Sequence, residues 1–415
     1  MNTIDLIPMS ESAKKIYDQV FDFIETRIKP SEALFKEQLA QSERLRDGKW
    51  MIPPVLEELK QEAKNLGLWN LFLPDTLHGR GLGNVDYAPI AELTGHSFIA
   101  PEIFNCQAPD SGNIELLHMY GNEEQNATWL LPLLSGDIRS AFLMTEPEAA
   151  CSDATNVSTQ IVRDGDDYVI NGRKWWITNA GDPRCKIYIV MGKTDNNADP
   201  YRQQSMILVP ADTEGVKIER MLSSGGYEHA PQGHGEVVLN NVRVPAKNLI
   251  LGEGRGFEIA QGRLGPGRIH HCMRLIGAAE KCLSLMCNRL ASREAFGKPL
   301  VKQTIWQQRV AELRMDIDMA RLLTLNAAHV MDLHGAKAAR KEIAMIKVVA
   351  PKMAQKVADM AIQSFGAAGL TQDTDLPEIF AGARALRIAD GPDEVHELTI
   401  AKYELKSQLS RHGAN

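Results

Sequence analysis

The sequence predicts an α+β fold in which a β-rich domain is inserted between two helical regions. Apolar residues recur at helical spacing before residue 139 and after residue 252. The stretch between carries short β-branched runs bounded by Gly, Pro, Asn and Asp. Because the period changes from that of a helix to that of a strand and back, we expect three domains, at residues 1–138, 139–252 and 253–415.

The N-terminal region is expected to be helical. A serine, Ser10 or Ser12, can cap the first helix, and Pro53-Pro54 can open another. Further helices are expected at residues 87–94 and 125–134.

A loop with the sequence CQAPDSGN interrupts these helices at residues 106–113. Asp110 or Ser111 is expected to cap the helix that follows, because a side-chain oxygen at this position accepts a hydrogen bond from the first turn.

The central domain is expected to be barrel-like. Its strands are predicted at residues 186–191, 205–209, 216–220 and 236–244, after a short apolar strand at 141–144. Asn171-Gly172 separates two further strand-like runs, and Asn-Gly between such runs favours a tight hairpin turn.

Two tryptophans follow this predicted turn. Successive residues of a strand point to opposite faces, so the rings of Trp175 and Trp176 are expected to diverge. A tryptophan here either fills the core or offers a flat surface to an aromatic ligand. The neighbouring Thr178 suits a ligand with polar edges.

The loop at residues 223–235 (SSGGYEHAPQGHG) carries His229 and His234. Their spacing is compatible with metal ligation, but no further ligand cluster accompanies them. We therefore expect no metal site.

The C-terminal region is expected to form long antiparallel helices. Gly265-Pro266-Gly267 is predicted to open the first, over residues 269–295, and two more are expected at 303–334 and 337–363. A last helix is predicted to follow Asp390 and to begin at Asp393 and Glu394, whose charges favour a helix N-terminus.

Composition limits the function classes. The 415 residues carry a formal net charge of −7, which argues against nucleic-acid binding, and no apolar run is long enough to span a membrane. The start of the chain has neither signal-peptide nor transit-peptide character. The six cysteines are scattered, as expected for reduced thiols in the cytoplasm.

Two motifs around the central strands resemble those of the acyl-CoA dehydrogenase family. MTEPEAACSD at residues 144–153 and NGRKWWITN at 171–179 are similar to the flavin-contacting segments of that family, at the same spacing. The resemblance covers the whole chain and implies a helical domain, a β-domain and a C-terminal four-helix bundle. It also implies FAD as cofactor, an acyl-CoA substrate, and a homodimer or homotetramer whose FAD sites span two subunits.

Three further motifs are similar to those of the family. REAFG at residues 293–297 resembles the segment that contacts FAD held by a neighbouring subunit, and QSFGAAG at 363–369 resembles a second such segment. The cofactor-binding residues implied by the resemblance are Met144, Thr145, Ser152, Trp176, Thr178, Arg293, Phe296, Gln303, Gln363, Gly366 and Gly391.

The third motif, IADGP at residues 388–392, stands where the family has the glutamate that removes the substrate's α-proton. The resemblance therefore implies Asp390 as the catalytic base, although an aspartate before Gly-Pro is also a common turn residue. Asp110, Ser111 and Arg268 are implied at the substrate pocket.

The resemblance implies an FAD-dependent dehydrogenase that removes an α-proton and a β-hydride from an acyl-CoA and passes electrons to an electron-transfer flavoprotein. CQAPDSGN, the Asp-Gly-Pro motif and the long histidine loop resemble a branch of the family acting on 4-hydroxy or 4-phospho acyl-CoAs. A redox-neutral reaction with loss of phosphate, a non-catalytic FAD- and CoA-binding role, and an oxidase activity stay open as alternatives.

Overall fold

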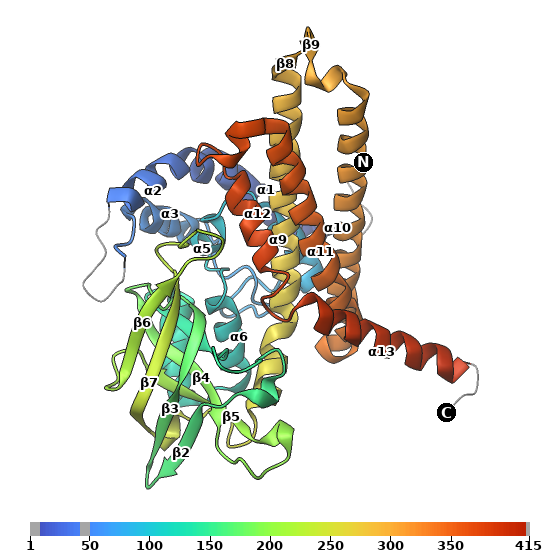
Figure 1. Ribbon diagram of the computed structural model, residues 1–415. Helices are drawn as coiled ribbons and strands as arrows, with labels where there is room; N and C mark the ends of the chain where they lie inside the picture. The colour runs from blue at the N-terminus through green and yellow to red at the C-terminus, as the bar shows by residue number, and fades with distance from the viewer. Residues whose placement is uncertain (1–8, 42–49, 412–415) are drawn as a thin grey trace. The chain divides into compact units, whose positions relative to one another are not determined.

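The computed structural model describes residues 9–41 and 50–411 (Figure 1). The first residues of the chain, on which the expectation of an untargeted N-terminus rests in part, lie outside these ranges. The described residues form two compact units, each built from discontinuous segments.

The first unit is helical and is drawn from Met1–Lys29, Leu82–Pro101 and Arg268–Asn415, as far as each is described. Ser10 caps its first helix, since its side chain accepts a hydrogen bond from the Ala13 amide, as predicted. Its α-helices are α1 (Glu11–Phe23), α4 (Asn84–Thr94), α9 (Gly256–Ser292, in this unit from Arg268), α10 (Thr304–Ala338), α11 (Arg340–Phe365), α12 (Leu376–Ala385) and α13 (Asp393–Arg411).

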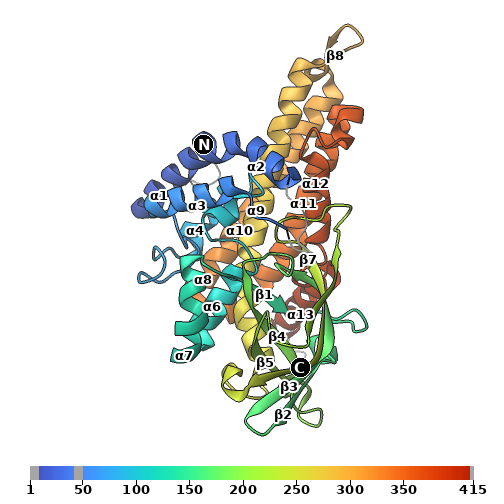
Figure 2. The ribbon, with the colours of Figure 1, turned by 90° about the vertical axis from the view of Figure 1, so that its left-hand side faces the viewer.

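Short elements complete this unit. A two-stranded hairpin, β8 (Glu294–Ala295) with β9 (Lys298–Pro299), lies at one tip of the long helices and is visible in both ribbon views (Figures 1 and 2). The remaining turns are the π-helix Ile24–Ile28 and the 3-10 helices Leu300–Lys302 and Gly366–Leu370.

The second unit combines helices with the sheet and comprises Pro30–Gly81 and Glu102–Gly267. Its α-helices are α2 (Lys29–Gln41), α3 (Pro54–Asn65), α6 (Asp110–Tyr120), α7 (Glu123–Gln125) and α8 (Leu131–Ser135), and α5 (Ala100–Ile103) ends in it. Its strands are β1 (Arg139–Leu143), β2 (Gln160–Asp164), β3 (Asp167–Thr178), β4 (Cys185–Lys193), β5 (Gln204–Pro210), β6 (Val216–Leu222) and β7 (His234–Pro245). Its other helical turns are Asn126–Leu130, Ala154–Asn156, Pro200–Arg202 and Ala246–Asn248.

The strands form one mixed sheet of seven strands. The pairing order is β1-β4-β2-β3-β7-β6, and β5 pairs with β4. β4 runs parallel to β1 and β2, whereas the other neighbours are antiparallel. One face buries a contiguous apolar cluster that includes Leu143, Ile170, Tyr188 and Val237.

The hairpin predicted at Asn171-Gly172 is wrong. β3 runs through both residues without turning, and the chain reverses earlier, between Asp164 and Asp167, where Gly165 has φ +62°. A type I′ turn needs positive φ at both central residues, and neither Asn171 nor Gly172 has it. The pair instead marks a shift of register against β7, a bulge that the Asn-Gly signal does not distinguish from a turn.

Two helix starts also differ from the prediction. α9 begins at Gly256, not after Gly265-Pro266-Gly267, and Pro266 lies inside it. Asp110 does not cap α6, because it is the first residue of the helix; Pro109 is the N-cap and provides no side-chain hydrogen bond. Helix α12 was not predicted, since its ten residues are too few to show a clear period beside the Gly-rich turn.

The helices α4 and α9 pack through glycines. A Cβ on Gly277 would lie 1.9 Å from the carbonyl oxygen of Glu92, and one on Gly95 would lie 2.1 Å from that of Arg274. Neither position has room for a methyl group, because both neighbours are backbone atoms.

We therefore expect Gly277→Ala to lower the free energy of unfolding by about 1–3 kcal/mol, since the added methyl forces the two helices apart. Urea unfolding followed by circular dichroism measures this. Gly382→Ala in α12 is the matched control, because nothing lies within 4 Å of its added Cβ; it should be neutral or raise stability by up to about 1 kcal/mol. An equal loss in both variants would contradict the packing argument.

Candidate functional site

The end of β1 is joined to β3 by a pair of reciprocal hydrogen bonds. The Thr145 hydroxyl donates to the Trp175 carbonyl oxygen at 2.7 Å, and the Trp175 amide donates to the Thr145 carbonyl oxygen at 3.0 Å. The two segments that carry the predicted flavin motifs therefore meet, although thirty residues separate them.

β3 is interrupted by a bulge at the two tryptophans. The register against β7 shifts between Lys174 and Ile177, and Trp176 adopts φ +56°, a left-handed conformation that is strained for a bulky side chain. The expectation that the rings diverge is wrong, since their centroids lie 6.3 Å apart. The bulge turns the indole of Trp176 outward, where 43% of the residue is exposed.

A buried ion pair lies beneath this bulge. The Lys174 ammonium contacts a Glu146 carboxylate oxygen at 2.8 Å and donates to the carbonyl oxygens of Met144 and Met191 at 2.9 and 2.7 Å. Glu146 also accepts hydrogen bonds from the backbone and hydroxyl groups of Ser158 and Thr159. The pair thus holds the Met144–Thr145 corner against two strands.

The charge state of this pair follows from its partners. Burial alone would raise the pKa of Glu146, but Lys174, Ser158 and Thr159 stabilise the carboxylate and lower its pKa to about 2. Burial lowers the pKa of Lys174, and Glu146 opposes that shift.

The other predicted flavin contacts of the sheet unit lie on β3 and in the loop after β1. Thr178 is the last residue of β3 and is half-buried, and its hydroxyl lies 3.0 Å from His234 Nδ1. Ser152 is exposed in the loop after β1.

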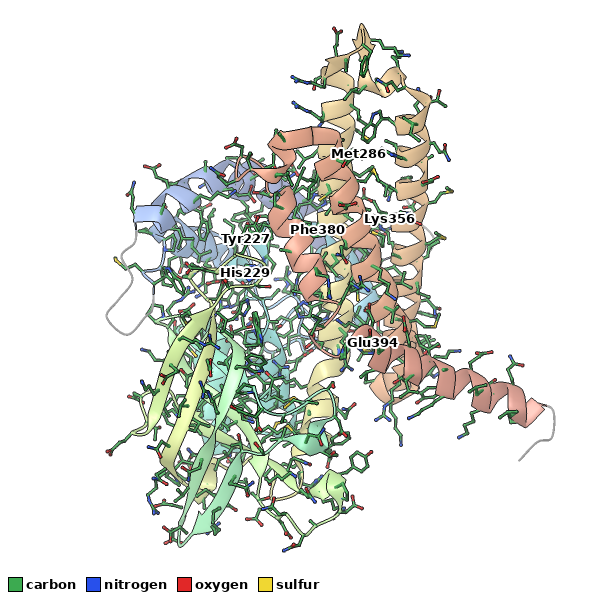
Figure 3. The ribbon with its side chains drawn as sticks, in the orientation of Figure 1. Tyr227, His229, Met286, Lys356, Phe380 and Glu394 are labelled. Carbon is green, nitrogen blue, oxygen red and sulfur yellow. The ribbon has the colours of Figure 1, made fainter. Side chains whose placement is uncertain are left out.

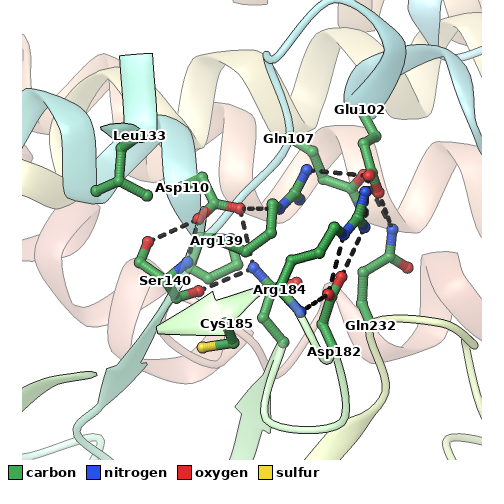
Figure 4. Close-up of polar contacts among 12 residues, drawn as sticks. Glu102, Gln107, Asp110, Leu133, Arg139, Ser140, Asp182, Arg184, Cys185 and Gln232 are labelled. Atoms are coloured by element: carbon green, nitrogen blue, oxygen red, sulfur yellow. Dashed lines mark hydrogen bonds and ion pairs between the residues drawn. The ribbon is translucent and has the colours of Figure 1, made fainter. Parts of the chain in front are cut away.

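Asp110 is the centre of a buried polar network (Figure 4). One carboxylate oxygen accepts hydrogen bonds from the Ser140 amide and hydroxyl at 2.6 and 2.7 Å. The other accepts from Asn179 Nδ2 at 2.9 Å and pairs with Arg139 Nε at 2.7 Å. Asp110 therefore links α6 to β1 and to the end of the predicted flavin motif at Asn179.

The network continues through a second carboxylate. Glu102 pairs with Arg139 at 3.2 Å and with Arg184 at 2.7 Å, and accepts a hydrogen bond from Gln232 at 2.5 Å. Burial would raise the pKa of Glu102, but the two guanidinium groups lower it to about 2. The loop before α6 is thus held by charges and has little freedom to rearrange.

Ser111 and Asn113 lie beside this network in α6. Both are buried, and Asn113 donates to Ser140 Oγ at 2.9 Å and accepts from Arg263 Nε at 2.9 Å. Polar side chains of the CQAPDSGN segment therefore find their hydrogen-bond partners within this unit.

In the helical unit, Asp390 occupies a tight turn before α13. Its φ is +56°, which aspartate tolerates better than most residues. Arg268 Nε and His396 Nε2 lie 3.1 and 3.2 Å from its carbonyl oxygen, while Lys347 donates to the carbonyl oxygens of Leu386 and Ala389 at 2.7 and 2.8 Å. The backbone is thus held by three side chains from other helices or from α13.

The carboxylate of Asp390 faces His271. The distance from Oδ2 to His271 Nε2 is 3.7 Å, and about a quarter of each side chain is exposed. The hydrogen bonds of Arg268 and His396 go to the carbonyl oxygen of Asp390, so they hold its backbone.

Burial governs the ionisation of the anchoring groups. It lowers the pKa of Arg268 and of Lys347, while the nearby Asp390 opposes both shifts. Burial and the charges of Arg268 and Lys347 lower the pKa of His396 to about 4, so this imidazole is neutral at pH 7. A carbonyl oxygen can only accept, so Nε2 of His396 carries its proton.

The remaining predicted cofactor residues of this unit are exposed or half-buried, and Gly391, in the turn after Asp390, is half-buried. Phe296, at the tip of the β8–β9 hairpin, is 96% exposed with φ +55°, and Arg293 beside it is also exposed. Gln303 is half-buried before α10, and Gln363 and Gly366 are exposed at the end of α11.

Several residues that shape these sites were not singled out by sequence analysis. Lys174 and Glu146 lie within the recognised motifs. Lys347 and His271 lie on long helices whose apolar period masks them. All six cysteines are free thiols, and among residues 9–41 and 50–411 no group of three His, Cys, Asp or Glu side chains could hold a metal.

Three domain models match the sequence. Residues 10–137, 141–242 and 254–405 match the N-terminal, middle and C-terminal domains of acyl-CoA dehydrogenase. A probable acyl-CoA dehydrogenase, FadE2 of Mycobacterium tuberculosis, is 57% identical over 363 residues, which cover 87% of this chain and 88% of that protein. The chain belongs to the acyl-CoA dehydrogenase family.

Longer relatives resemble the chain over part of their length. Acyl-CoA dehydrogenase family members 10 and 11 of mouse are each 54% identical, over 96% and 98% of this chain. The chain spans 37% and 52% of their lengths, so it corresponds to about half or less of each.

Solved structures confirm the α+β prediction. A putative acyl-CoA dehydrogenase from Mycobacterium abscessus aligns with a TM-score of 0.93 at 51% identity, covering 97% of this chain and all of that one. Butyryl-CoA dehydrogenase from Megasphaera elsdenii aligns with a TM-score of 0.80 at 25% identity, covering 96% and 99% of the two chains. A glutaryl-CoA dehydrogenase from Mycobacterium smegmatis in complex with FADH2 aligns at 0.78 and 26%, covering 96% and 95%.

None of the helices in the described part of the chain is both long and apolar enough to cross a membrane.

Proposed function

We propose that the chain is an FAD-dependent acyl-CoA dehydrogenase, an oxidoreductase acting on a carbon–carbon single bond, with Asp390 as the base. The observation that carries this proposal is the reciprocal hydrogen bonding of Thr145 and Trp175, which unites the two flavin-type motifs. Family membership and the solved complex of a relative with FADH2 support it.

The residues of the sheet unit fit a flavin. Trp176 offers an exposed indole, and Thr145, Ser152 and Thr178, from the same two motifs, carry hydroxyl groups that can donate and accept. An isoalloxazine ring has a flat apolar face and a polar rim, so it is complementary to this set of groups. When bound, FAD supplies the acceptor for the hydride that leaves the β-carbon.

The residues of the helical unit suit proton abstraction. The turn that carries Asp390 is held through its carbonyl oxygens by Arg268, His396 and Lys347, and the carboxylate lies 3.7 Å from His271 Nε2, so its position is fixed by the turn. A carboxylate at a fixed position can take the α-proton of a thioester placed beside it.

The proposal extends to substrate, partners and compartment. An acyl-CoA is the substrate, an electron-transfer flavoprotein is the electron acceptor, and the chain works as a homodimer or homotetramer in the cytoplasm. Asp110, Ser111 and Arg268 are proposed at the substrate pocket. Arg293, Phe296, Gln303, Gln363 and Gly366 are proposed to contact FAD of a second copy, and Met144 and Gly391 to contact the flavin.

The test is the visible spectrum of the purified protein without oxygen, as acyl-CoAs are added one by one. Bleaching of the flavin bands by a straight-chain or branched acyl-CoA supports the dehydrogenase and names the substrate class. Persistent colour with release of phosphate from a 4-phospho acyl-CoA means that the redox-neutral reaction operates instead. Bound flavin without bleaching or turnover indicates a non-catalytic binding role, and failure to bind FAD contradicts the proposal.

The exposed hairpin yields a separate prediction. Phe296→Ala is expected to weaken FAD binding about tenfold, the scale of losing one stacked ring, while leaving stability unchanged because the side chain is 96% exposed. Equilibrium dialysis of FAD measures the affinity. Leu333→Ala, which removes a 61% exposed side chain of α10, is the control and should bind FAD normally. Equal affinity for FAD in both variants would show that Phe296 does not contact FAD.

A further inference from the structure

Two histidines extend the hydrogen bonding of Thr178 away from the sheet. His234 Nδ1 lies 3.0 Å from Thr178 Oγ1, and His234 Nε2 lies 2.8 Å from His229 Nδ1. His229 is in the loop between β6 and β7, where Figure 3 labels it beside Tyr227. Thr178, His234 and His229 thus form an unbroken chain of polar atoms.

The surroundings of this chain keep both rings in place and uncharged. The ring of His234 packs edge-on against that of His229, with centroids 5.0 Å apart, and lies 5.8 Å from that of Trp176. Burial lowers the pKa of His229, and burial with the neighbouring His229 lowers that of His234 to about 4. Each imidazole therefore carries a single ring proton near pH 7.

A neutral imidazole couples its two hydrogen bonds, because one ring nitrogen donates and the other accepts. If His234 Nε2 donates to His229, then His234 Nδ1 accepts the Thr178 proton, and Thr178 Oγ1 can only accept from a ligand. If His229 Nδ1 donates to His234, then His234 Nδ1 donates to Thr178, whose own proton is free for a ligand acceptor.

A flavin with its N5 near this hydroxyl would call on both arrangements. N5 accepts a hydrogen bond when a flavin is oxidised and donates one when it is reduced. A threonine held by a serine or by water would accept either role without a preference, whereas the histidine pair links the role of the hydroxyl to a proton position.

We propose that His229 and His234 form a proton relay that ends at the Thr178 hydroxyl and switches it between donor and acceptor. This inference rests on the proposed flavin site at Thr178. In the switching event that accompanies reoxidation, an external oxidant would take the electrons of the reduced ligand, and the proton that the ligand gives up would enter at Thr178 Oγ1. The threonine proton then passes to His234 Nδ1, the proton of His234 Nε2 passes to His229 Nδ1, and the proton of His229 Nε2 leaves. Each ring ends neutral, so atoms and charge balance. His229 is half-buried, so we assign the exit of the proton to solvent to this residue.

The first experiment locates the ring protons by solid-state NMR of holoenzyme labelled with ¹⁵N-histidine, assigned with a His229→Gln difference spectrum. We expect His234 to carry its proton on Nδ1 in the oxidised enzyme and on Nε2 after reduction with dithionite. An identical tautomer in both states overturns the relay. Uptake of FAD, read from visible absorption, is scored separately: no uptake defeats the proposed function and the relay with it, whereas uptake with an unchanged tautomer defeats the relay alone.

The second experiment follows proton release with a pH-indicator dye while ferrocenium, an outer-sphere oxidant, reoxidises the reduced holoenzyme. His229→Gln keeps a hydrogen-bond partner for His234 but cannot pass a proton through a second ring nitrogen. His229→Leu removes the partner altogether. We expect both variants to release the proton about tenfold more slowly or worse, with flavin still bound. His329→Gln, an exposed histidine of α10, is the control and should match the wild type. Wild-type release rates in both His229 variants would refute the relay.

Discussion

Asp390→Asn is expected to bind FAD and acyl-CoA but to lose about 10²–10⁴-fold in the rate at which acyl-CoA bleaches the flavin. The amide has the shape of the carboxylate and tolerates the left-handed φ of +56° at this position. The contacts of Arg268 and His396 are to the carbonyl oxygen and persist in the variant. The variant removes the negative charge and the capacity to accept a proton, and it keeps the backbone anchor, so we expect the loss in the chemical step. Stopped-flow absorbance without oxygen measures it.

Glu394→Gln is the matched control for this variant. It neutralises an exposed carboxylate four residues away, in the first turn of α13, and should leave the bleaching rate unchanged. An unaltered rate in Asp390→Asn would mean that Asp390 is a turn residue or that another group is the base. Asp390→Glu is a stricter probe, since glutamate reaches further but fits a left-handed turn less well.

Lys174→Met is expected to lower the free energy of unfolding by about 3–5 kcal/mol and to weaken flavin binding. The substitution leaves the carboxylate of Glu146 buried without its cation, which is the costly way to break a buried ion pair. It also releases the carbonyl oxygen of Met144, which lies next to Thr145. Urea unfolding measures the first effect, and FAD titration measures the second.

The control is Lys186→Met, because Lys186 is exposed in β4 and contacts only a nearby backbone carbonyl among the described hydrogen bonds. It should change stability by less than about 0.5 kcal/mol. Similar losses of stability in the two variants would show that the buried ion pair contributes no more to stability than a surface lysine does.

Acid unfolding provides a second test of the Lys174–Glu146 ion pair. The folded-state pKa of Glu146 is about 2, below its ordinary value of 4.5. The stability it contributes is therefore fully present above about pH 4.5 and is lost as the pH falls towards 2. In Lys174→Met the pKa of Glu146 should rise, so acid unfolding followed by tryptophan fluorescence should begin at a higher pH than in the wild type.

Much of the architecture could be predicted from the sequence because it depends on local patterns. The period of apolar residues located the long helices α10 and α11 and the strands β4 to β7, and Ser10 and Pro54 marked helix starts through chemistry confined to one turn. The family was recognised from contiguous motifs for the same reason. The roles assigned to Asp390, Trp176 and Thr178 stay predictions that the experiments above address.

Where those local signals were ambiguous or incomplete, only the tertiary structure decided the outcome. Asn171-Gly172 is compatible with a turn or a bulge, and pairing with β7 selects the bulge. Lys174 reaches the carbonyl oxygens of Met144 and Met191, Thr178 meets a histidine 56 residues later, and Arg268 anchors a carbonyl 122 residues later. Such partners leave no trace in periodicity or in any motif, since a hydrogen bond requires atoms within about 3 Å and only the folded chain brings residues so distant in sequence to that separation.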